Sequence, residues 1–137
     1  MPFHLSIVTP DGEWYREPVD SIVLPGSEGD FGVLPSHERF LTPLRIGEIE
    51  IRSQDGNRLY AAIANGFADV RGDEVTVMVE SCEFAEAIDV ARAELARDRA
   101  EQGLAELGDT NEKRLEQYQA AIQRARNRLA VSRRGEG

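Results

Sequence analysis

The chain has 137 residues, 41% of them hydrophobic and 30% charged, so one or two globular domains fit and a disordered chain is excluded. No stretch has the roughly 18 apolar residues of a membrane span, the N-terminus lacks the pattern of a signal peptide, and the single cysteine excludes an internal disulfide. The net charge is −9, with 15 acids against 6 bases in residues 1–84, which excludes a general nucleic-acid binder and leaves a small, soluble, cytosolic protein as the expectation.

Residues 1–84 carry short alternating or β-branched runs separated by turn signals, which predicts a sandwich or barrel of short strands. The expected strands are 3–8, 19–24, 47–52, 59–63, 67–71 and 75–79. Turns are expected at Pro10-Asp11-Gly12, Asp55-Gly56 and Gly72-Asp73. In the third strand, Ile49 and Ile51 should face inward, and we expect Glu48 and Glu50 on the solvated outer face.

Residues 85–137 change to a helical period. Phe84, Ile88, Ala91 and Leu95 predict the apolar stripe of a first helix that runs to Leu107. After a break at 108–111, an apolar seam predicts a second helix through Leu115, Tyr118, Ile122, Ala125 and Leu129. The two helices should form an antiparallel hairpin that could dock on the β-domain or extend from it.

Two local features of this helical part carry predictions of their own. Asp109, followed three residues later by Glu112, resembles a capping box at the start of the second helix. Gly103 should weaken the first helix by about 1 kcal/mol relative to Ala.

Catalytic motifs are absent from the sequence. There is no P-loop, and the only histidines, His4 and His37, cannot form a metal cluster with Cys82. A serine nucleophile would have to use one of these two histidines without a nucleophile elbow. Nothing in the sequence therefore indicates an enzyme that acts alone.

A loop of special backbone residues is expected between Pro25 and His37. It can be a structural crossover between sheets, which spacing alone favours. It can also be a docking loop that presents Glu28, Asp30 and His37 to a partner, because binding residues concentrate on loops held by rigid scaffolds.

Arginines of the two helices form a second constellation. Arg92 and Arg99 share a helix face, and an antiparallel partner helix could bring Arg124 or Arg126 towards them, which would make a clamp for a triphosphate. The alternative, favoured by periodicity alone, is a solvated face on which these arginines pair with neighbouring carboxylates such as Asp89.

Over essentially its whole length, the sequence resembles the epsilon subunit family of bacterial F-type ATP synthases. The resemblance rests on five motifs whose order and spacing both fit the family, namely 23–37 (VLPGSEGDFGVLPSH), 41–44 (LTPL), 65–70 (NGFADV), 75–77 (VTV) and 88–93 (IDVARA).

This resemblance implies a flattened antiparallel β-sandwich, residues 1–84, followed by a two-helix regulatory domain, residues 85–137. It implies a non-catalytic rotor subunit of the central stalk, whose sandwich binds the gamma subunit and rests on the c-subunit ring at the cytoplasmic face of the bacterial plasma membrane. Glu28, Asp30 and His37 would face that ring and the neighbouring stalk.

The helical domain would be regulatory. Residues 113–137 carry seven bases against two acids. By the resemblance, this basic helix would reach a beta subunit when the hairpin extends, and would block ATP hydrolysis. The basic residues assigned to this role are Arg114, Arg124, Arg126 and Arg128.

Some members of the family also bind ATP between the two helices, although no cofactor is required. The residues that match this site are Glu83, Ile88, Asp89, Arg92, Ala93, Arg99 and Arg126. Three hypotheses are therefore carried forward: a rotor subunit, which the sequence favours, a stand-alone ATP sensor, and a small hydrolase on a β-scaffold.

Overall fold

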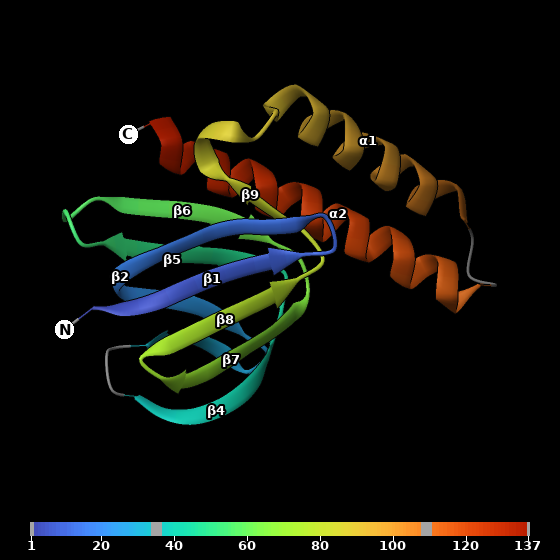
Figure 1. Ribbon diagram of the computed structural model, residues 1–137. Coiled ribbons are helices and arrows are strands. Elements are labelled where there is room, and N and C mark those ends of the chain that lie inside the picture. The colour runs from blue at the N-terminus through green and yellow to red at the C-terminus, as the bar shows by residue number, and fades with distance from the viewer. Residues whose placement is uncertain (1, 34–36, 108–110, 137) are drawn as a thin grey trace.

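A computed structural model describes residues 2–33, 37–107 and 111–136, and shows a two-layered β-sandwich with a pair of helices beside one end of it (Figure 1). The strands are β1 (Phe3–Thr9), β2 (Gly12–Gly26), β3 (Gly29–Val33), β4 (His37–Leu44), β5 (Gly47–Ser53), β6 (Arg58–Ile63), β7 (Gly66–Gly72), β8 (Glu74–Val79) and β9 (Cys82–Phe84). The helical elements are η1 (Ala85–Ala87), α1 (Val90–Leu107), α2 (Glu112–Ser132) and η2 (Arg133–Glu136).

The long strand β2 belongs to both layers. Its first half pairs with β1, with Val19 opposite Phe3, and its second half pairs with β3 and β5, with Ile22 opposite Ile51. An irregularity between Val19 and Ser21 marks the corner at which the strand changes layers. An antiparallel sandwich was expected, and the pairs of neighbouring strands are antiparallel except for β1 and β8, which run parallel.

The core between the layers consists of the inward residues of each strand. Leu5, Ile7, Ile22, Ile49 and Ile51 are all fully buried. Each such side chain contributes about 1.5–3 kcal/mol relative to its exposed state. The predicted inward phase of Ile49 and Ile51 is therefore confirmed.

The three predicted turns are confirmed, since each contains a glycine with positive φ (Gly12, Gly56 and Gly72). The segment after Pro25 is neither a crossover nor an open loop. It forms the β2–β3 hairpin, with Ser27 and Glu28 at the turn and Gly29 at φ +136°. Residues 34–36 of the predicted loop lie outside the described residues.

The first helix begins later and buries another face than the stripe predicts. Phe84 belongs to β9, and α1 starts at Val90 after Asp89, whose Oδ1 accepts a hydrogen bond from the Arg92 backbone N–H at 3.1 Å. Ala93 and Ala100 are the buried positions of α1, whereas Leu95 is 49% exposed. Small side chains allow α1 and α2 to pack closely, so the alanines face α2 and the larger Leu95 faces solvent.

The seam of the second helix agrees better with its prediction. Ile122 and Ala125 are buried, although Leu115 is exposed. The N-cap is Asn111, whose Oδ1 accepts a hydrogen bond from the Arg114 N–H at 3.1 Å. The capping box is therefore wrong in its register, and Asp109 itself lies outside the described residues.

Gly103 has a packing role that propensity does not reveal. A Cβ atom at this position would lie 2.4 Å from Cε1 of Tyr118, so the glycine lets the tyrosine ring of α2 approach the backbone of α1. Within the hairpin, α2 contacts β5, β6 and η1, and α1 packs on α2. The end of the hairpin where α1 leads into α2 projects beyond the sandwich (Figure 1).

Candidate functional site

A cavity of about 250 Å³ lies where the sandwich meets both helices. Glu83 of β9, Ala96 of α1, and Arg124 and Arg128 of α2 are among the residues that line it. One carboxylate, two guanidiniums and small alanine walls make this the place in the described structure where the predicted arginine constellation is realised in part.

Arg128 and Glu83 form the central ion pair of this cavity. Nη2 of Arg128 donates a hydrogen bond to Oε2 of Glu83 at 3.1 Å, and Nε lies 2.8 Å from Oε1. Nε is nevertheless not aligned to donate to that oxygen, and it is buried with no hydrogen-bond acceptor among the described residues. Nε carries a single N–H and the Glu83 carboxylate already lies against it, so the pair is held by charge and by the Nη2 hydrogen bond.

The residues predicted on α1 for ATP binding are only partly grouped with this cavity. Ile88 and Ala93 are buried packing residues, and Asp89 caps α1. Arg92 and Arg99 are exposed and do not line the cavity.

Arg126 lies elsewhere than predicted. Its Nη2 donates a hydrogen bond at 3.1 Å to Oε1 of Glu101 on α1, so it takes part in a helix–helix ion pair. Its neighbours Arg124 and Arg128, which line the same cavity as Glu83, are the arginines that the sequence did not identify as a pair. A spacing of four residues, which places both on one helix face, is the signal that could have identified them.

The proposed basic face of α2 is not one face. Arg126 is two positions from Arg124 and from Arg128, a step of about 200° around a helix, so it points away from them. Arg128 is engaged with Glu83 in the docked hairpin. Of the four arginines, Arg114 and Arg124 alone make no ion pair with a described residue.

The acidic docking residues are separated. Glu28 is exposed at the β2–β3 turn, and Asp30 beside it is paired with Arg45. Leu44, at the far end of β4 from His37, pairs with Gly26 at this same turn. His37 begins β4 and pairs with Gly72, so about 20 Å of strand separates it from the turn. The structure therefore does not place His37 with Glu28 and Asp30, and its side chain lies outside the described set.

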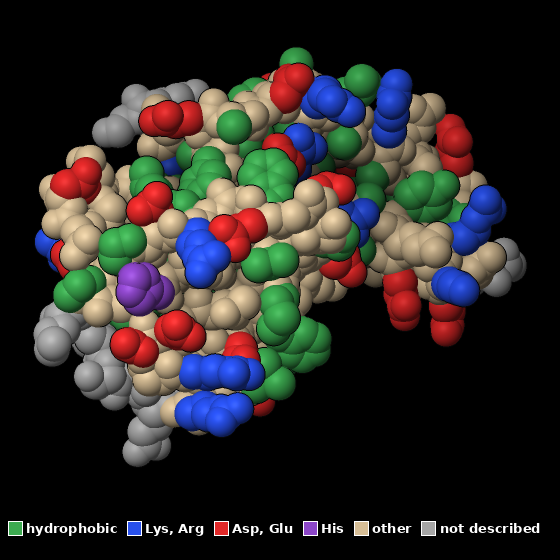
Figure 2. All heavy atoms as spheres, viewed as in Figure 1, with side chains coloured by type: hydrophobic (Ala, Val, Ile, Leu, Met, Phe, Trp, Pro, Cys, Tyr) green, Lys and Arg blue, Asp and Glu red, His purple; other side chains and the backbone are tan. Residues whose placement is uncertain are grey.

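An exposed apolar row crosses the outer face of the sandwich. Phe67 of β7 lies between Pro43 of β4 and Met78 of β8 in the strand register, and Leu41 is two residues from Pro43. Leu41, Phe67 and Met78 are 63%, 50% and 42% exposed. We call Leu41, Pro43, Phe67 and Met78 the outer patch, and Figure 2 shows hydrophobic side chains gathered over the ends of β7 and β8.

The outer patch was missed in the sequence although a signal for it exists. Ala68 and Val70 take the inward positions of β7, which forces the large Phe67 outward. A large apolar residue on the outer phase, next to similar residues on both neighbouring strands, is typical of a protein–protein contact surface.

Other kinds of site find little support in the described residues. No group of three or more His, Cys, Asp or Glu side chains within them could hold a metal ion. Burial, followed by the charge of Glu83, raises the pKa of the Cys82 thiol to about 12, so this cysteine is not a nucleophile. Among the helices described, none is long and apolar enough to cross a bilayer.

Comparison with known protein families gives two successive matches. Residues 2–85 match the model described as "ATP synthase, Delta/Epsilon chain, beta-sandwich domain". Residues 86–133 match the one described as "ATP synthase, Delta/Epsilon chain, long alpha-helix domain".

Similar proteins include several called "ATP synthase epsilon chain". The chain is 46% identical over 128 residues to the one from Nitratidesulfovibrio vulgaris, with 93% of each chain covered. It is 47% identical to that of Syntrophobacter fumaroxidans, again with 93% of both chains covered, and 39% identical to that of Bacillus velezensis, with 93% of this chain and 95% of the other covered.

Two solved structures share the fold. A chain in the cryo-EM structure of "Euglena gracilis mitochondrial ATP synthase, OSCP/F1/c-ring" matches with a TM-score of 0.80 at 24% identity, covering 94% of this chain and 80% of the other. A chain in the "central stalk/cring" of the Tetrahymena thermophila mitochondrial ATP synthase matches with a TM-score of 0.60 at 13% identity, covering 94% and 95%.

Proposed function

This chain belongs to the ATP synthase epsilon chain family, whose members are non-catalytic subunits of F-type ATP synthase, and we propose that it is a rotor subunit of the central stalk that couples proton translocation to ATP synthesis. The observation that carries the proposal is that the two domains of one subunit match in succession from residue 2 to residue 133. Catalysis would reside in the beta subunits of the complex.

The outer patch is the surface we assign to the gamma subunit. Burial of Leu41, Phe67 and Met78 against a partner would remove exposed apolar side chains from water, which is the main driving force of stable association. The row spans three adjacent strands, so it offers a rigid, preformed surface.

A matched pair of charge substitutions tests this assignment. Phe67→Glu should abolish or greatly weaken capture by the purified gamma subunit, because a carboxylate would have to be buried at the centre of the contact. Leu95→Glu, at an equally exposed apolar position on α1, should bind gamma as the unmodified chain does. Equal binding by all three proteins would move the interface away from the outer patch, and no binding by the unmodified chain would refute the rotor proposal.

We assign the acidic β2–β3 turn to the c-subunit ring. Glu28 is exposed there and Arg45 leaves Asp30 partly accessible, so the turn offers negative charge to basic and polar loops. Such a contact would place the protein peripherally, at the cytoplasmic face of the bacterial membrane. Cross-linking from a cysteine at Glu28 to the assembled ring would test this contact, and cross-linking from His37 instead would contradict it.

The helical hairpin is the part we assign to restraint of ATP hydrolysis. The attachment of α2 to the sandwich is small, whereas α1 packs on α2 and can move with it. An extended hairpin would carry the arginines of α2 towards a beta subunit, and release of Arg128 from Glu83 would add one more free cation to it.

ATP binding is the second candidate function, and the cavity at Glu83 is the observation that favours it. Arg124 and Arg128 line it from one helix, and guanidiniums bind phosphate oxygens bidentately. Because the cavity is only about 250 Å³ in volume, it would hold phosphate groups without the remainder of a nucleotide unless the helices moved apart.

Calorimetric titration with ATP separates the sequence-based site from this cavity. If ATP binds in the cavity, Arg124→Ala should weaken binding and Arg126→Ala should leave it unchanged, since Arg126 is paired with Glu101. The reverse order would restore the sequence-based assignment. Absence of heat at millimolar ATP would eliminate the sensor function while leaving the rotor function intact.

A further inference from the structure

The hairpin is attached to the sandwich mainly through the second half of α2. The contacts of α2 are mainly with β5, β6 and η1, and the Arg128–Glu83 ion pair adds a contact with β9. The opposite end of the hairpin projects beyond the sandwich (Figure 1). Whatever holds the hairpin down must therefore act through the last turns of α2 and through η2.

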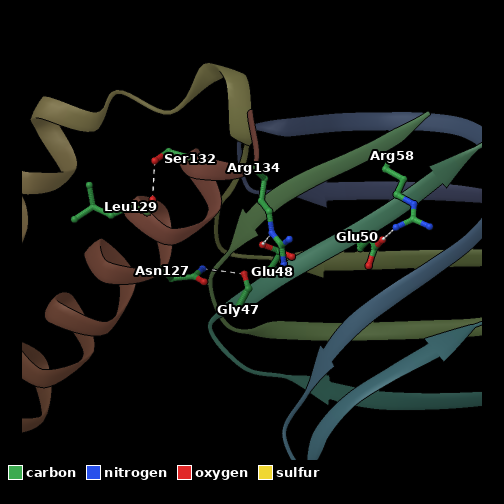
Figure 3. Close-up of polar contacts among 8 residues, drawn as sticks. All are labelled: Gly47, Glu48, Glu50, Arg58, Asn127, Leu129, Ser132 and Arg134. Carbon is green, nitrogen blue, oxygen red and sulfur yellow. Dashed lines mark hydrogen bonds and ion pairs between the residues drawn. The ribbon is translucent and has the colours of Figure 1, made fainter. Parts of the chain in front are cut away.

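Polar contacts from these last turns converge on the start of β5. Nδ2 of Asn127 donates a hydrogen bond to the Gly47 carbonyl at 2.8 Å, and Nε of Arg134 donates one to Oε2 of Glu48 at 3.2 Å (Figure 3). The Arg134 guanidinium also lies over the ring of Tyr60, 4.9 Å from its centroid. Glu48 therefore has a partner in the hairpin, which corrects the expectation that it is only a solvated surface residue.

An apolar contact lies beside these polar ones. Val131 is 1% exposed and packs in a small cluster with Ala62 of β6, Ala85 and Ile88. This cluster is separate from the main core of the sandwich, and Val131 is the member that α2 supplies, so undocking of α2 would expose it.

We infer that Asn127, Val131 and Arg134 form a latch that holds the hairpin on the sandwich without any bound ligand, and whose release frees both helices together. The physical basis is that the contacts of these three residues lie within residues 127–134, beside the Arg128–Glu83 ion pair that adds to the same attachment, whereas α1 is carried by α2. The Arg134 side chain is 54% exposed, so its ion pair is weak enough to break reversibly. The proposal deepens the regulatory role given above, but the latch itself concerns the isolated chain.

The isolated chain is well suited to a distance measurement. Cys82 is its only cysteine and is buried, with its thiol pKa raised by that burial, so introduced cysteines can be labelled selectively. Gln54→Cys in the β5–β6 loop and Gln117→Cys on α2 are both at exposed positions. Energy transfer between dyes at these two positions reports the open fraction of the hairpin, with no gamma subunit or nucleotide present.

Substitutions of the latch residues then test the proposal. Arg134→Ala should raise the ratio of open to closed hairpin roughly fivefold, as the loss of one exposed ion pair and one cation–π contact implies. Asn127→Ala should act in the same direction, and Arg134→Lys should stay close to the parent because it keeps the charge.

Arg133→Ala is the matched control, since it removes one charge from the same turn at a side chain that pairs with no described residue. If Arg133→Ala and Arg134→Ala open the hairpin equally, or if Arg134→Ala leaves the ratio unchanged, the latch is refuted. Fluorescence emission of Trp14 verifies that the sandwich of each variant is folded. If Arg134→Ala misfolds, Glu48→Gln removes the same ion pair from the sandwich side. Capture by gamma depends on the outer patch, so a failed latch would leave the rotor proposal untouched.

Discussion

The substitution Gly103→Ala separates helix propensity from tertiary packing, because the two predict opposite signs. In an isolated helix, replacing a glycine by alanine stabilises by about 1 kcal/mol. In the folded hairpin, the new methyl group would lie 2.4 Å from Cε1 and 2.7 Å from Cζ of Tyr118, well inside contact distance. Gly103 is therefore a position where the sequence misleads.

The expected magnitude follows from the geometry. Overpacking of a methyl group against a neighbour costs about 1–3 kcal/mol, because the ring or the helix must move. After the propensity gain of about 1 kcal/mol is subtracted, the hairpin should lose about 1 kcal/mol in its free energy of unfolding. The sandwich should be unaffected, since Tyr118 contacts α1.

Urea unfolding with two probes measures this loss. Circular dichroism follows the helices, and fluorescence of Trp14, the single tryptophan, follows the sandwich through its place beside Thr9. Gly103→Ala should shift the transition followed by circular dichroism to lower urea and leave the transition followed by Trp14 fluorescence unchanged. Ala105→Gly, at an exposed position of the same helix, is the control for propensity alone and should cost about 1 kcal/mol.

A second substitution makes the reasoning refutable. Tyr118→Leu removes the ring that the new methyl group meets, so in that background Gly103→Ala should stabilise the hairpin. If Gly103→Ala stabilises the unmodified chain, or if its effect is the same with Leu at position 118, the close approach of the ring to α1 does not determine the role of this glycine.

Three further predictions concern regulation, reactivity and pH. Deleting residues 110–137 should leave gamma binding intact and raise ATP hydrolysis by the reconstituted complex several-fold, and loss of gamma binding would show that the interface includes α2. Cys82, with a thiol pKa of about 12, should resist thiol reagents at pH 8 in the native state and react once unfolded, and rapid native reaction would contradict its burial. Hydrogen bonds from Ser53 and Asn57 hold the pKa of Asp55 below its ordinary value. The ionised carboxylate therefore stabilises the folded state at pH values above the unfolded pKa of about 4. This contribution is lost as the pH falls through the folded pKa. Asp55→Asn should therefore lower the urea midpoint at pH 7 and match the parent in strong acid, and a constant difference at all pH values would argue against this.

The β-domain could be predicted well from sequence because its signals are local. Alternation places Ile49 and Ile51 inward whatever the rest of the chain does, and glycine at positions 56 and 72 fixes tight turns. The parallel pairing of β1 with β8 could not be predicted, since it joins residues as far apart in the chain as His4 and Glu74 and leaves no local signal.

The helical part was predicted in kind but not in detail. Helix propensity and the seam at Ile122 and Ala125 indicated a hairpin. They could not show that α1 buries Ala93 and leaves Leu95 in solvent, because the buried face of α1 is the one that packs against α2. Small side chains are favoured at the contact where two helices approach closely.

The candidate site shows the same division. The sequence identified Glu83 and the arginines of the second helix, but it chose Arg126 where the cavity has Arg124 and Arg128. A step of two residues reverses the direction of a side chain on a helix, so the axial rotation of α2 decides which arginine meets Glu83.

By itself, the sequence determined the fold class, the order of the two domains and the family, because periodicity, turn residues and motif spacing are properties of the chain read in one direction. The tertiary structure alone decided which residues meet across the domains. Arg134 is 86 residues from Glu48, and Arg128 is 45 from Glu83. Such pairs depend on how α2 rotates and docks, which is set by the packing of Val131 and Tyr118 and leaves no periodic trace in the sequence.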